Sequence, residues 1–441
     1  MQRTLLATLV SASLIFGSQA ACAGTVTVLT SFPKELTTAY KKAFEAANPG
    51  ITVEILNKNT TASVAYVREL PEGQRPDVMW ASAPDAFEVL SSFNLLQPAP
   101  EVVNKSAPAK IGNYPLNDPK GMYYGQALAG YGISWNTRYL KAHKLPEPKQ
   151  WTDLIKPEYF GHIAISSPSR SGTTQLTVET ILQGEGWEKG WSQLLQMMGN
   201  ATAVTDRSFA VPDGVNNGQY GIGIVIDFLA LAGKYSGYPV DFTYPTMTAV
   251  VPANIALIAG AKNTDEAKKF MSFTMSEPGQ QLLFEPKIAR LPILPYSMLK
   301  PPAGYPVPQD IAARAKVQFD SQLSGKRYPV VISLFDQMVT FRLKELQAAT
   351  KSIQEAAAAL KAKPSARGNE LLAQARSLAY TPLVGADNVK NEEFLDLFRK
   401  SRRDVAVSKQ LTGMEQMWSE KARANYERAR QLADEARGLA K

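Results

Sequence analysis

The chain of 441 residues is poor in the side chains on which metal sites, disulfides and nucleophile pairs are usually built. It contains one cysteine, Cys22, and two histidines, His143 and His162. A disulfide needs two cysteines, and zinc sites and Cys/His nucleophile pairs need clusters of these residues. G-x-S-x-G and H-E-x-x-H motifs are also absent. We therefore expect no metal site, no cofactor and no catalytic activity, which disfavours the alternative of an exported hydrolase.

The rest of the composition is that of a globular protein. Hydrophobic residues make up 45% of the chain and charged residues 20%, with 29 glycines and 29 prolines. At roughly 150 residues per domain, the length is consistent with about three domains, or with two lobes and an extension.

The first residues have the pattern of an export signal. Arg3 is followed by the apolar run Leu5 to Phe16 and by small residues up to Gly24. We predict a signal peptide over residues 1–23 and hence a periplasmic protein. The alternative is a lipoprotein anchored through Cys22, although Gln19 stands where such signals carry leucine. No later run of about 20 apolar residues predicts a membrane span.

From Thr25 onward, short apolar runs alternate with amphipathic helical stretches. The runs Val26–Thr30, Ile51–Leu56 and Asp77–Trp80 read as strands, and the alternation is typical of an α/β fold with parallel strands. After Pro301–Pro308 the composition changes to Ala, Gln, Lys, Arg and Glu at helical spacing, as in Leu343–Ala362. We therefore expect several helices in the last part of the chain.

The segment Ser167–Thr174 is the strongest candidate for a binding loop. It follows the predicted strand His162–Ser166, is rich in Ser, Thr and Gly, and opens a predicted helix. The N-terminus of a helix presents backbone N–H groups and a positive dipole to an anion, and Arg170 can add a two-pronged donor. The alternative is an ordinary helix cap and turn, with Arg170 in solvent. The loop is not a P-loop, because the spacing and the lysine of that motif are missing.

Other candidate contacts lie at predicted strand ends, where open α/β sheets bind ligands. Ser31 and Ser82 are examples, and for Ser82 a capping-box-like start with Asp85 is the alternative role. Arg207 is a second possible cation, against a surface ion pair with Asp206. The complete set of candidate contacts is Thr30, Ser31, Ser82, Tyr131, Ser169, Arg170, Ser171, Gly172, Thr173, Thr174, Arg207 and Asp227.

Two members of this set have buried surroundings. Asp227 ends the apolar strand Gly221–Ile226, where a carboxylate needs partners such as ligand hydroxyls or an arginine of the cleft. Tyr131, between Gly130 and Gly132, can face the cleft or pack in the core.

Several short motifs occur in order along the first 300 residues: Pro76-Asp-Val-Met-Trp80, Gly132-Ile-Ser-Trp-Asn-Thr137, Trp151-Thr-Asp-Leu154, Ser167-Pro-Ser-Arg-Ser-Gly-Thr173 and Asp265-Glu-Ala-Lys-Lys-Phe270. Together they resemble the type II periplasmic solute-binding proteins of ABC importers, in the branch with ferric-ion, sugar-phosphate, phosphonate and phosphoglycerate binders. The resemblance implies an α/β fold of two lobes joined by hinge strands, which close on a solute in the cleft. The expected domains are residues 24–128 with 250–305, residues 129–249, and a helical C-terminal extension over residues 306–441.

The resemblance also implies partners and a ligand class. We expect a monomer that delivers a small anionic solute, phosphorylated in the leading hypothesis, to an inner-membrane ABC permease. The alternative is a sensory component that signals to a membrane receptor kinase. Iron-binding members carry adjacent tyrosines near the position of Val225–Phe228 here, and the pair is missing. A predicted helix also separates His143 from His162, so a ferric-ion site is disfavoured.

The positive charge is confined to one part of the chain. The formal net charge is +8, but residues 24–300 carry 24 basic and 24 acidic side chains, whereas residues 301–441 carry 23 basic and 16 acidic. An anion preference of the lobes must therefore come from a few placed donors rather than from a general field. In an exported protein we expect no nucleic acid as partner.

Overall fold

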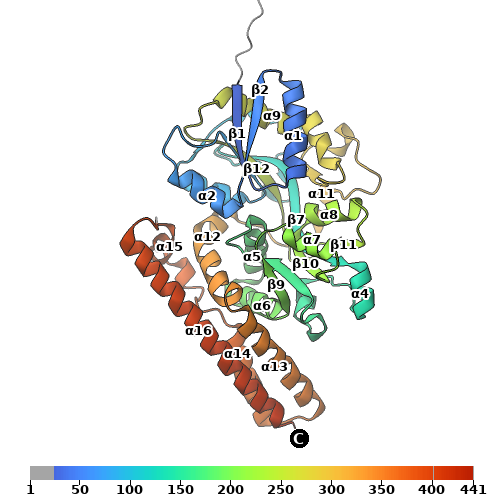
Figure 1. Ribbon diagram of the computed structural model, residues 1–441, viewed down its shortest axis with the longest axis vertical. Coiled ribbons are helices and arrows are strands. Elements are labelled where there is room, and N and C mark those ends of the chain that lie inside the picture. Colours follow the sequence, from blue (N-terminus) through green and yellow to red (C-terminus); the bar gives the residue numbers. More distant parts are fainter. Residues whose placement is uncertain (1–23, 401, 441) are drawn as a thin grey trace, which may run out of the picture.

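The computed structural model describes residues 24–400 and 402–440. The predicted signal peptide and Cys22 lie outside the described residues. Figure 1 shows two lobes stacked one above the other, with a helical bundle that projects beyond the second lobe. Among the described residues, no helix combines the length and apolar character that a membrane-spanning segment needs.

The first lobe is built on a sheet with the strand order β2-β1-β3-β12-β7. Its elements are β1 (Gly24–Thr30), α1 (Lys34–Ala47), β2 (Ile51–Asn57), α2 (Thr60–Glu69), β3 (Val78–Ala81), α3 (Pro84–Ser92), β4 (Leu96–Gln97), β12 (Val250–Ile258), α9 (Thr264–Met275), α10 (Glu277–Gln281) and β13 (Leu291–Pro292). Strand β1 pairs in parallel with both β2 and β3. Their carboxyl ends therefore meet at one edge of the sheet, where the helices that follow begin.

The second lobe continues the same sheet in the order β7-β10-β8-β9. Its elements are α4 (Thr137–His143), β8 (Ile163–Ser166), α5 (Gly172–Glu185), α6 (Trp187–Gly199), β9 (Ala201–Thr205), α7 (Ala210–Asn216), β10 (Ile222–Ile226), α8 (Asp227–Tyr235) and β11 (Val240–Thr243). Strand β8 is parallel to both β9 and β10. The carboxyl ends of β8, β9 and β10 therefore meet at one edge of this part of the sheet.

A single strand belongs to both lobes. All 13 residues of β7 (Tyr124–Asn136) are buried. Its first half, Tyr124–Gly130, pairs with β12 and its second half, Tyr131–Trp135, pairs with β10. The predicted lobe boundary between residues 128 and 129 therefore falls inside this shared strand. The other predicted boundary, at residue 250, falls at the start of β12.

The C-terminal extension is helical, as the sequence predicts. It consists of α11 (Pro308–Arg314), α12 (Ser321–Phe335), a π-helical turn (Asp336–Thr340), α13 (Leu343–Ala362), α14 (Ala366–Tyr380), α15 (Glu392–Arg399) and α16 (Val405–Gly438). The α13 residues Leu346, Ala349, Ile353, Ala356 and Leu360 are buried at helical spacing.

The apolar core of the second lobe runs without a break into the extension. Trp191 and Met197 of α6 belong to the same buried cluster as Ile353 of α13 and Tyr426 of α16. At Gly199, a Cβ atom would collide with Thr350 of α13, which shows how closely α6 and α13 approach. The extension is thus packed onto the second lobe and is not a separate body.

Helix α12 contacts both lobes through buried polar groups. Ser324 Oγ donates to Asp85 Oδ2 of the first lobe at 2.7 Å. Arg327 forms a bidentate ion pair with Glu179 of α5 in the second lobe, with N···O distances of 2.7 to 3.0 Å. In Figure 1 this helix lies between α2 and α5. One end of the space between the lobes is therefore bridged by the extension.

Candidate functional site

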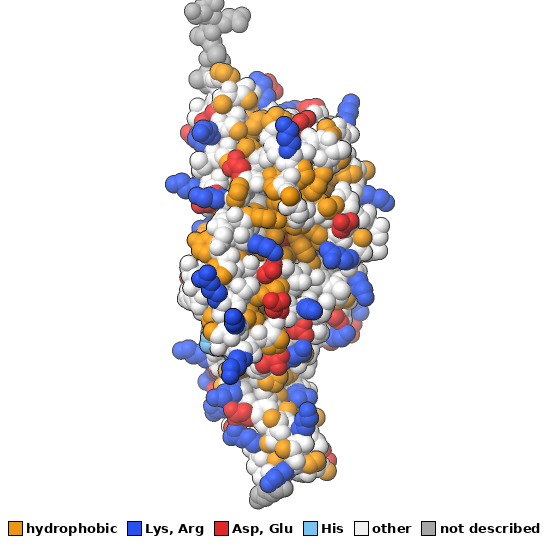
Figure 2. All heavy atoms as spheres, turned by 90° about the vertical axis from the view of Figure 1, so that its right-hand side faces the viewer, with side chains coloured by type: hydrophobic (Ala, Val, Ile, Leu, Met, Phe, Trp, Pro, Cys, Tyr) orange, Lys and Arg blue, Asp and Glu red, His pale blue; other side chains and the backbone are white. Residues whose placement is uncertain are grey.

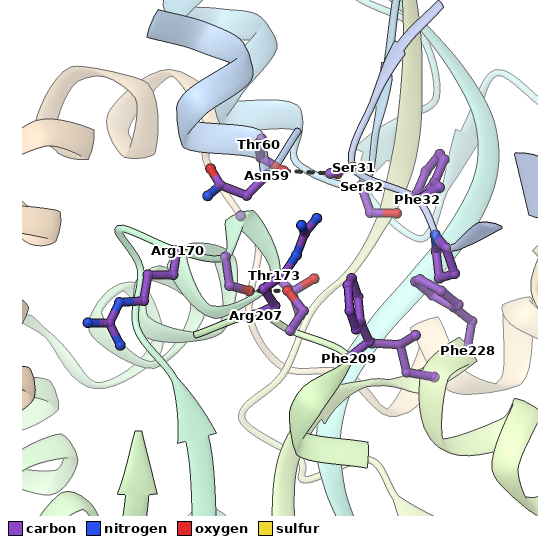
Figure 3. Close-up of a pocket in the computed structure, with 15 residues that line it drawn as sticks. Ser31, Phe32, Asn59, Thr60, Ser82, Arg170, Thr173, Arg207, Phe209 and Phe228 are labelled. Atoms are coloured by element: carbon purple, nitrogen blue, oxygen red, sulfur yellow. Dashed lines mark hydrogen bonds between the residues drawn. The ribbon is translucent and has the colours of Figure 1, made fainter. Parts of the chain in front are cut away.

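A small cavity lies where the two lobes meet (Figure 3). Its volume is about 30 Å³, which is room for one or two water molecules. Its wall consists of Ser31, Phe32, Pro33, Asn59, Thr60, Ser82, Arg170, Ser171, Gly172, Thr173, Arg207, Ser208, Phe209, Phe228 and Leu229.

The wall contains the beginnings of helices from both lobes. Pro33, Asn59 and Ser171 are the N-cap residues of α1, α2 and α5. Ser82 directly precedes the N-cap of α3, and Phe228 lies in the first turn of α8. The first N–H groups of a helix have no partner within the helix, and the helix dipole makes this end positive. The first turns of α1, α3 and α8 carry the acidic residues Glu35, Asp85 and Asp227. Those of α2 and α5 carry none, so these two ends, facing each other across the cavity wall, are the setting for an anion.

The predicted binding loop lies at this cavity. Ser171 Oγ accepts a hydrogen bond from the Thr174 backbone N–H at 3.0 Å, and Ser171 also bonds Ser208. A Cβ atom on Gly172 would stand 2.6 Å from Thr60 Oγ1 of the first lobe. Glycine therefore allows the start of α5 to approach the start of α2. The helix-cap role, which the sequence left as the alternative, is present, and contact of this loop with an anion stays a prediction.

The two arginines of this region have different partners. Arg207 Nη2 donates across the cleft to Asn57 Oδ1 at 3.1 Å, and its guanidinium lies over the Phe209 ring. Arg170 is paired with Asp206 at 3.0 Å, and in Figure 3 its guanidinium points away from the cavity centre. The alternative of an Arg207–Asp206 pair is wrong, because Asp206 faces Arg170.

On the first lobe, two predicted serines reach the cavity. Ser31 Oγ accepts from Thr60 Oγ1 at 3.1 Å. Ser82 Oγ accepts from Arg290 Nη2 at 2.6 Å and does not cap α3, whose N-cap is Ala83 without a side-chain bond. The capping-box expectation for Ser82 is therefore wrong, because its hydroxyl accepts a hydrogen bond from Arg290 of a distant segment and not from a backbone N–H of α3.

Five predicted contacts, Thr30, Tyr131, Ser169, Thr174 and Asp227, do not line the cavity. Thr30 Oγ1 accepts from the Phe32 N–H within a turn, and Ser169 bonds Ser167. Tyr131 is completely buried, as its alternative core role requires. The roles of the twelve residues in ligand contact stay predictions.

Asp227 is already satisfied inside the protein. It is the first residue of α8, and its carboxylate accepts hydrogen bonds from the Gly130 and Phe228 N–H groups and from the Tyr244 hydroxyl, at 2.7 to 3.0 Å. Burial raises the pKa of this carboxyl to about 6. The partners that a buried carboxylate needs are thus backbone groups and a tyrosine.

Arg290, between α10 and β13, is the residue that sequence reasoning missed. It is fully buried, and its guanidinium lies against the rings of Phe32 and Phe228, with Cζ 4.3 and 4.4 Å from the ring centroids. A signal was present, since Arg290 is the one charged residue in the apolar run Ile288–Leu294. A charge in such a run is costly unless it has a role.

The two histidines lie together, contrary to expectation. Their ring centroids are 5.1 Å apart, and the Tyr139 hydroxyl is 2.9 Å from His162 Nδ1. Burial, with a smaller effect of His143, lowers the pKa of His162. Within residues 24–400 and 402–440, no group of three His, Cys, Asp or Glu residues is arranged to hold a metal ion.

A wider recess adjoins the cavity on the side of α1, α7 and α8. It measures about 900 Å³ and shares Phe32, Pro33, Phe209 and Leu229 with the cavity wall. Figure 2 shows apolar side chains gathered at mid-height on this face, where the surface is hollowed. The recess therefore lies next to the cavity on a side that α12 does not bridge.

Comparisons with known proteins agree with this architecture. The sequence profile of the family described as bacterial extracellular solute-binding protein matches residues 74–314. The phosphoglycerate transport regulatory protein PgtC of Salmonella typhimurium is 29% identical over 387 residues, which are 87% of this chain and 92% of that protein. The major ferric iron-binding protein of Neisseria meningitidis serogroup B is 24% identical over 299 residues, 64% of this chain and 86% of that one.

Solved structures show the same fold. The periplasmic binding protein AfuA from Actinobacillus pleuropneumoniae, determined with exogenous fructose-6-phosphate bound, superimposes with a TM-score of 0.62 at 18% identity. It covers 72% of this chain and 99% of its own. The predicted likeness to periplasmic solute-binding proteins and the predicted α/β fold are confirmed.

Proposed function

Because this chain belongs to the bacterial extracellular solute-binding protein family, we propose that it captures a small phosphorylated organic solute between its lobes. It then delivers the solute from the periplasm to an inner-membrane ABC permease. The observation that carries the proposal is the meeting of the starts of α2 and α5 with Arg207 on one cavity. Helix N-termini bind phosphate groups through their free N–H groups and positive dipole.

The net charge of the two lobes indicates that individual hydrogen-bond donors, rather than a general positive field, would attract an anion. Residues 24–300 carry equal numbers of acidic and basic side chains. Specificity for an anion must then come from the cavity wall, which is rich in hydroxyl and N–H donors. One relative is named a phosphoglycerate transport regulatory protein, and one protein of the same fold was solved with fructose-6-phosphate bound.

The cavity must open to admit such a solute. A volume of about 30 Å³ is too small for an organic phosphate. Two hydrogen bonds cross the cleft, from Arg207 to Asn57 and from Thr61 Oγ1 to the Pro168 carbonyl at 3.3 Å. We infer a hinge motion at β7 and β12 that breaks these bonds, and the solute favours closure by binding the closed form more tightly.

Sensing is a second candidate function, and helix α12 favours it. This helix holds buried polar contacts with both lobes, so a change in their separation must displace the extension relative to one of them. A membrane receptor kinase would detect that displacement of the extension. To separate the two functions, the permease is deleted and solute-induced gene expression is measured. Induction that persists and requires this protein supports sensing, and loss of induction supports transport alone.

The experiment for the binding function is a thermal-shift panel with the full chain. The compounds are 3-phosphoglycerate, phosphoenolpyruvate, glucose 6-phosphate, 2-aminoethylphosphonate and ferric citrate. A ligand at 100 times its Kd stabilises the folded state by about 2.7 kcal/mol, which raises Tm by several degrees. We expect this rise with at least one phosphorylated compound and none with ferric citrate. The absence of any response to the phosphorylated compounds would refute the proposal.

A further inference from the structure

Arg290 is a buried cation whose hydrogen-bonding capacity is only partly used. Its side chain is fully buried, and Nη2 donates to Ser82. Within the described part of the chain, Nε and Nη1 have no hydrogen-bond partner. Its strongest electrostatic partner, Asp227, already accepts three other hydrogen bonds. Burying a charge in this way is unfavourable unless something pairs with it.

The arginine lies one side chain beneath the cavity. The three residues that contact its guanidinium, Ser82, Phe32 and Phe228, all line the cavity wall. The backbone beside it is anchored, because the Tyr305 hydroxyl donates to the Arg290 carbonyl at 3.1 Å and Leu291 pairs with β7. Three side chains of the cavity wall therefore also contact the cation.

The cover over Arg290 is divided between the lobes. Phe32 follows β1 in the first lobe, whereas Phe228 lies in the first turn of α8 in the second. The two rings meet edge to face, 6.3 Å apart. When the lobes separate, Phe228 leaves with the second lobe, and the guanidinium, which stays with the first lobe, loses one of its two aromatic covers. An open cleft thus exposes a cation that the closed structure hides.

The cavity then has cationic groups at two places. Arg207 and the start of α5 belong to the second lobe, and Arg290 with Ser82 belongs to the first. The helix start and its hydroxyls suit a phosphate, and the guanidinium in its narrower apolar surroundings suits a planar carboxylate, which it can bind through two N–H groups.

On the basis of the function proposed above, we propose that the solute carries a carboxylate in addition to its phosphate, and that Arg290 and Ser82 bind this carboxylate. The ligand class is that of small phosphorylated hydroxy acids, and phosphorylated sugars without an acid group are poor ligands. Binding would then give Arg290 a carboxylate in direct hydrogen-bond contact, which Asp227, held by three other hydrogen bonds, does not provide.

The test is isothermal titration of the full chain with three compounds: 3-phosphoglycerate, glycerol 3-phosphate, which lacks the carboxylate, and glycerate, which lacks the phosphate. We expect the wild type to bind 3-phosphoglycerate at least tenfold more tightly than glycerol 3-phosphate. In Arg290→Met the two affinities should agree within twofold, with that for glycerol 3-phosphate unchanged. The matched control is Arg75→Met, a half-buried first-lobe arginine that bonds backbone carbonyls of Leu70 and Ala259 and should keep the tenfold preference.

Thermal unfolding without ligand gives an independent readout. Methionine has similar length and no charge to desolvate, so the Tm of Arg290→Met should equal or exceed that of the wild type. If Arg290→Met fails to fold, Arg290 is needed for folding and the expectation for the Tm of this variant is wrong. The carboxylate site is then tested with Arg290→Lys, which keeps the cation but loses the planar two-pronged donor. Its affinity for 3-phosphoglycerate should fall at least fivefold, while its affinity for glycerol 3-phosphate should not change.

Each other outcome has a defined meaning. Equal wild-type affinities for the two phosphates refute the carboxylate site and leave the proposed function standing. The carboxylate site is also refuted if Arg290→Met still prefers 3-phosphoglycerate to glycerol 3-phosphate. An equal loss of affinity for both compounds refutes it as well, because Arg290 would then bind the phosphate. If the wild type binds none of the three compounds, the inference is contradicted, and the proposed function is decided separately by the thermal-shift panel.

Discussion

Arg207 and Arg170 allow the contribution of a single cation at the cavity to be measured. Both line the wall, but Arg207 reaches across the cleft, while Arg170 is neutralised by Asp206. We predict that Arg207→Ala weakens binding of the phosphorylated solute 10- to 100-fold, because a charge-assisted contact is lost. Arg170→Ala, the matched control, should change the Kd less than threefold. Equal losses in a titration would contradict the distinction between them.

Asp85 is expected to make stability depend on pH. Its carboxylate is fully buried, and burial, reinforced by Glu179, raises its pKa to about 7 against the favourable bond from Ser324. The folded state therefore holds a proton that the unfolded chain releases near pH 4. Stability from this group is complete at low pH and falls as pH rises from about 4 to 7, by up to about 1.4 kcal/mol per pH unit.

The prediction is checked by denaturant unfolding at pH 5 and pH 8. We expect Asp85→Asn to lose this part of the decline, because an amide has no proton to release. Glu72→Gln, an exposed change, should leave the wild-type slope in place. A variant of Asp85 with the full wild-type decline would show that other groups cause it.

At the residue scale, the sequence allowed prediction of groups whose role is local. Ser171, Gly172 and Thr173 could be placed because a strand, a hydroxyl-rich loop and a helix follow one another in the chain. Arg290 could not be placed, because its neighbours Ser82 and Phe228 are 208 and 62 positions away. The partner of Asp206 was missed for a similar reason, since Arg170 comes from another loop.

Helix α12 owes its position to a buried ion pair. Arg327 and Glu179 are 8% and 0% exposed, and the pair is bidentate. We predict that Glu179→Gln lowers the free energy of unfolding by about 3–5 kcal/mol, because it leaves Arg327 buried without a counter-charge. The control on the same helix is Lys326→Ala, which removes an exposed pair with Glu392 and should cost less than about 1 kcal/mol.

Denaturant unfolding of both variants measures the difference. A Glu179→Gln variant as stable as Lys326→Ala would mean that water or another group compensates Arg327. The loss is also expected to be non-additive with Arg327→Met, because the double variant leaves no unpaired charge.

Element bounds were predictable where apolar periodicity is strong. The prediction for Leu343–Ala362 agrees with α13, because its buried face repeats at helical spacing from Leu346 to Leu360. Helix α5 begins at Gly172, inside the predicted loop Ser167–Thr174. Glycine and threonine are poor helix formers, so the pattern does not show that the first turn is held by Ser171 and by contact with the other lobe.

At the scale of the whole molecule, the extension and the second lobe form one folding unit. Trp187 and Trp191 of α6 are 5% and 0% exposed because helices of the extension cover them. We predict that a chain ending at Tyr305 does not give a soluble, cooperatively unfolding protein, since this apolar face would meet water. A chain ending at Gly438 is the control and should behave as the full chain. Expression, gel filtration and thermal unfolding decide the outcome.

A soluble shortened chain with a sharp transition would show that the lobes fold alone. The order of sequence motifs was enough to predict a two-lobed α/β protein with a helical extension. It could not show that the extension shares a core with one lobe and bridges both, because these contacts join residues more than 100 positions apart, such as Glu179 and Arg327.

The shared core also bears on how such a chain could arise in evolution. Two solved structures of this fold are covered over 99% of their own length but match only 72% of this chain. In this chain, Trp187, Trp191 and Met197 belong to an apolar core that helices of the extension complete. A change that removed the extension would therefore expose this face unless these residues became polar at the same time.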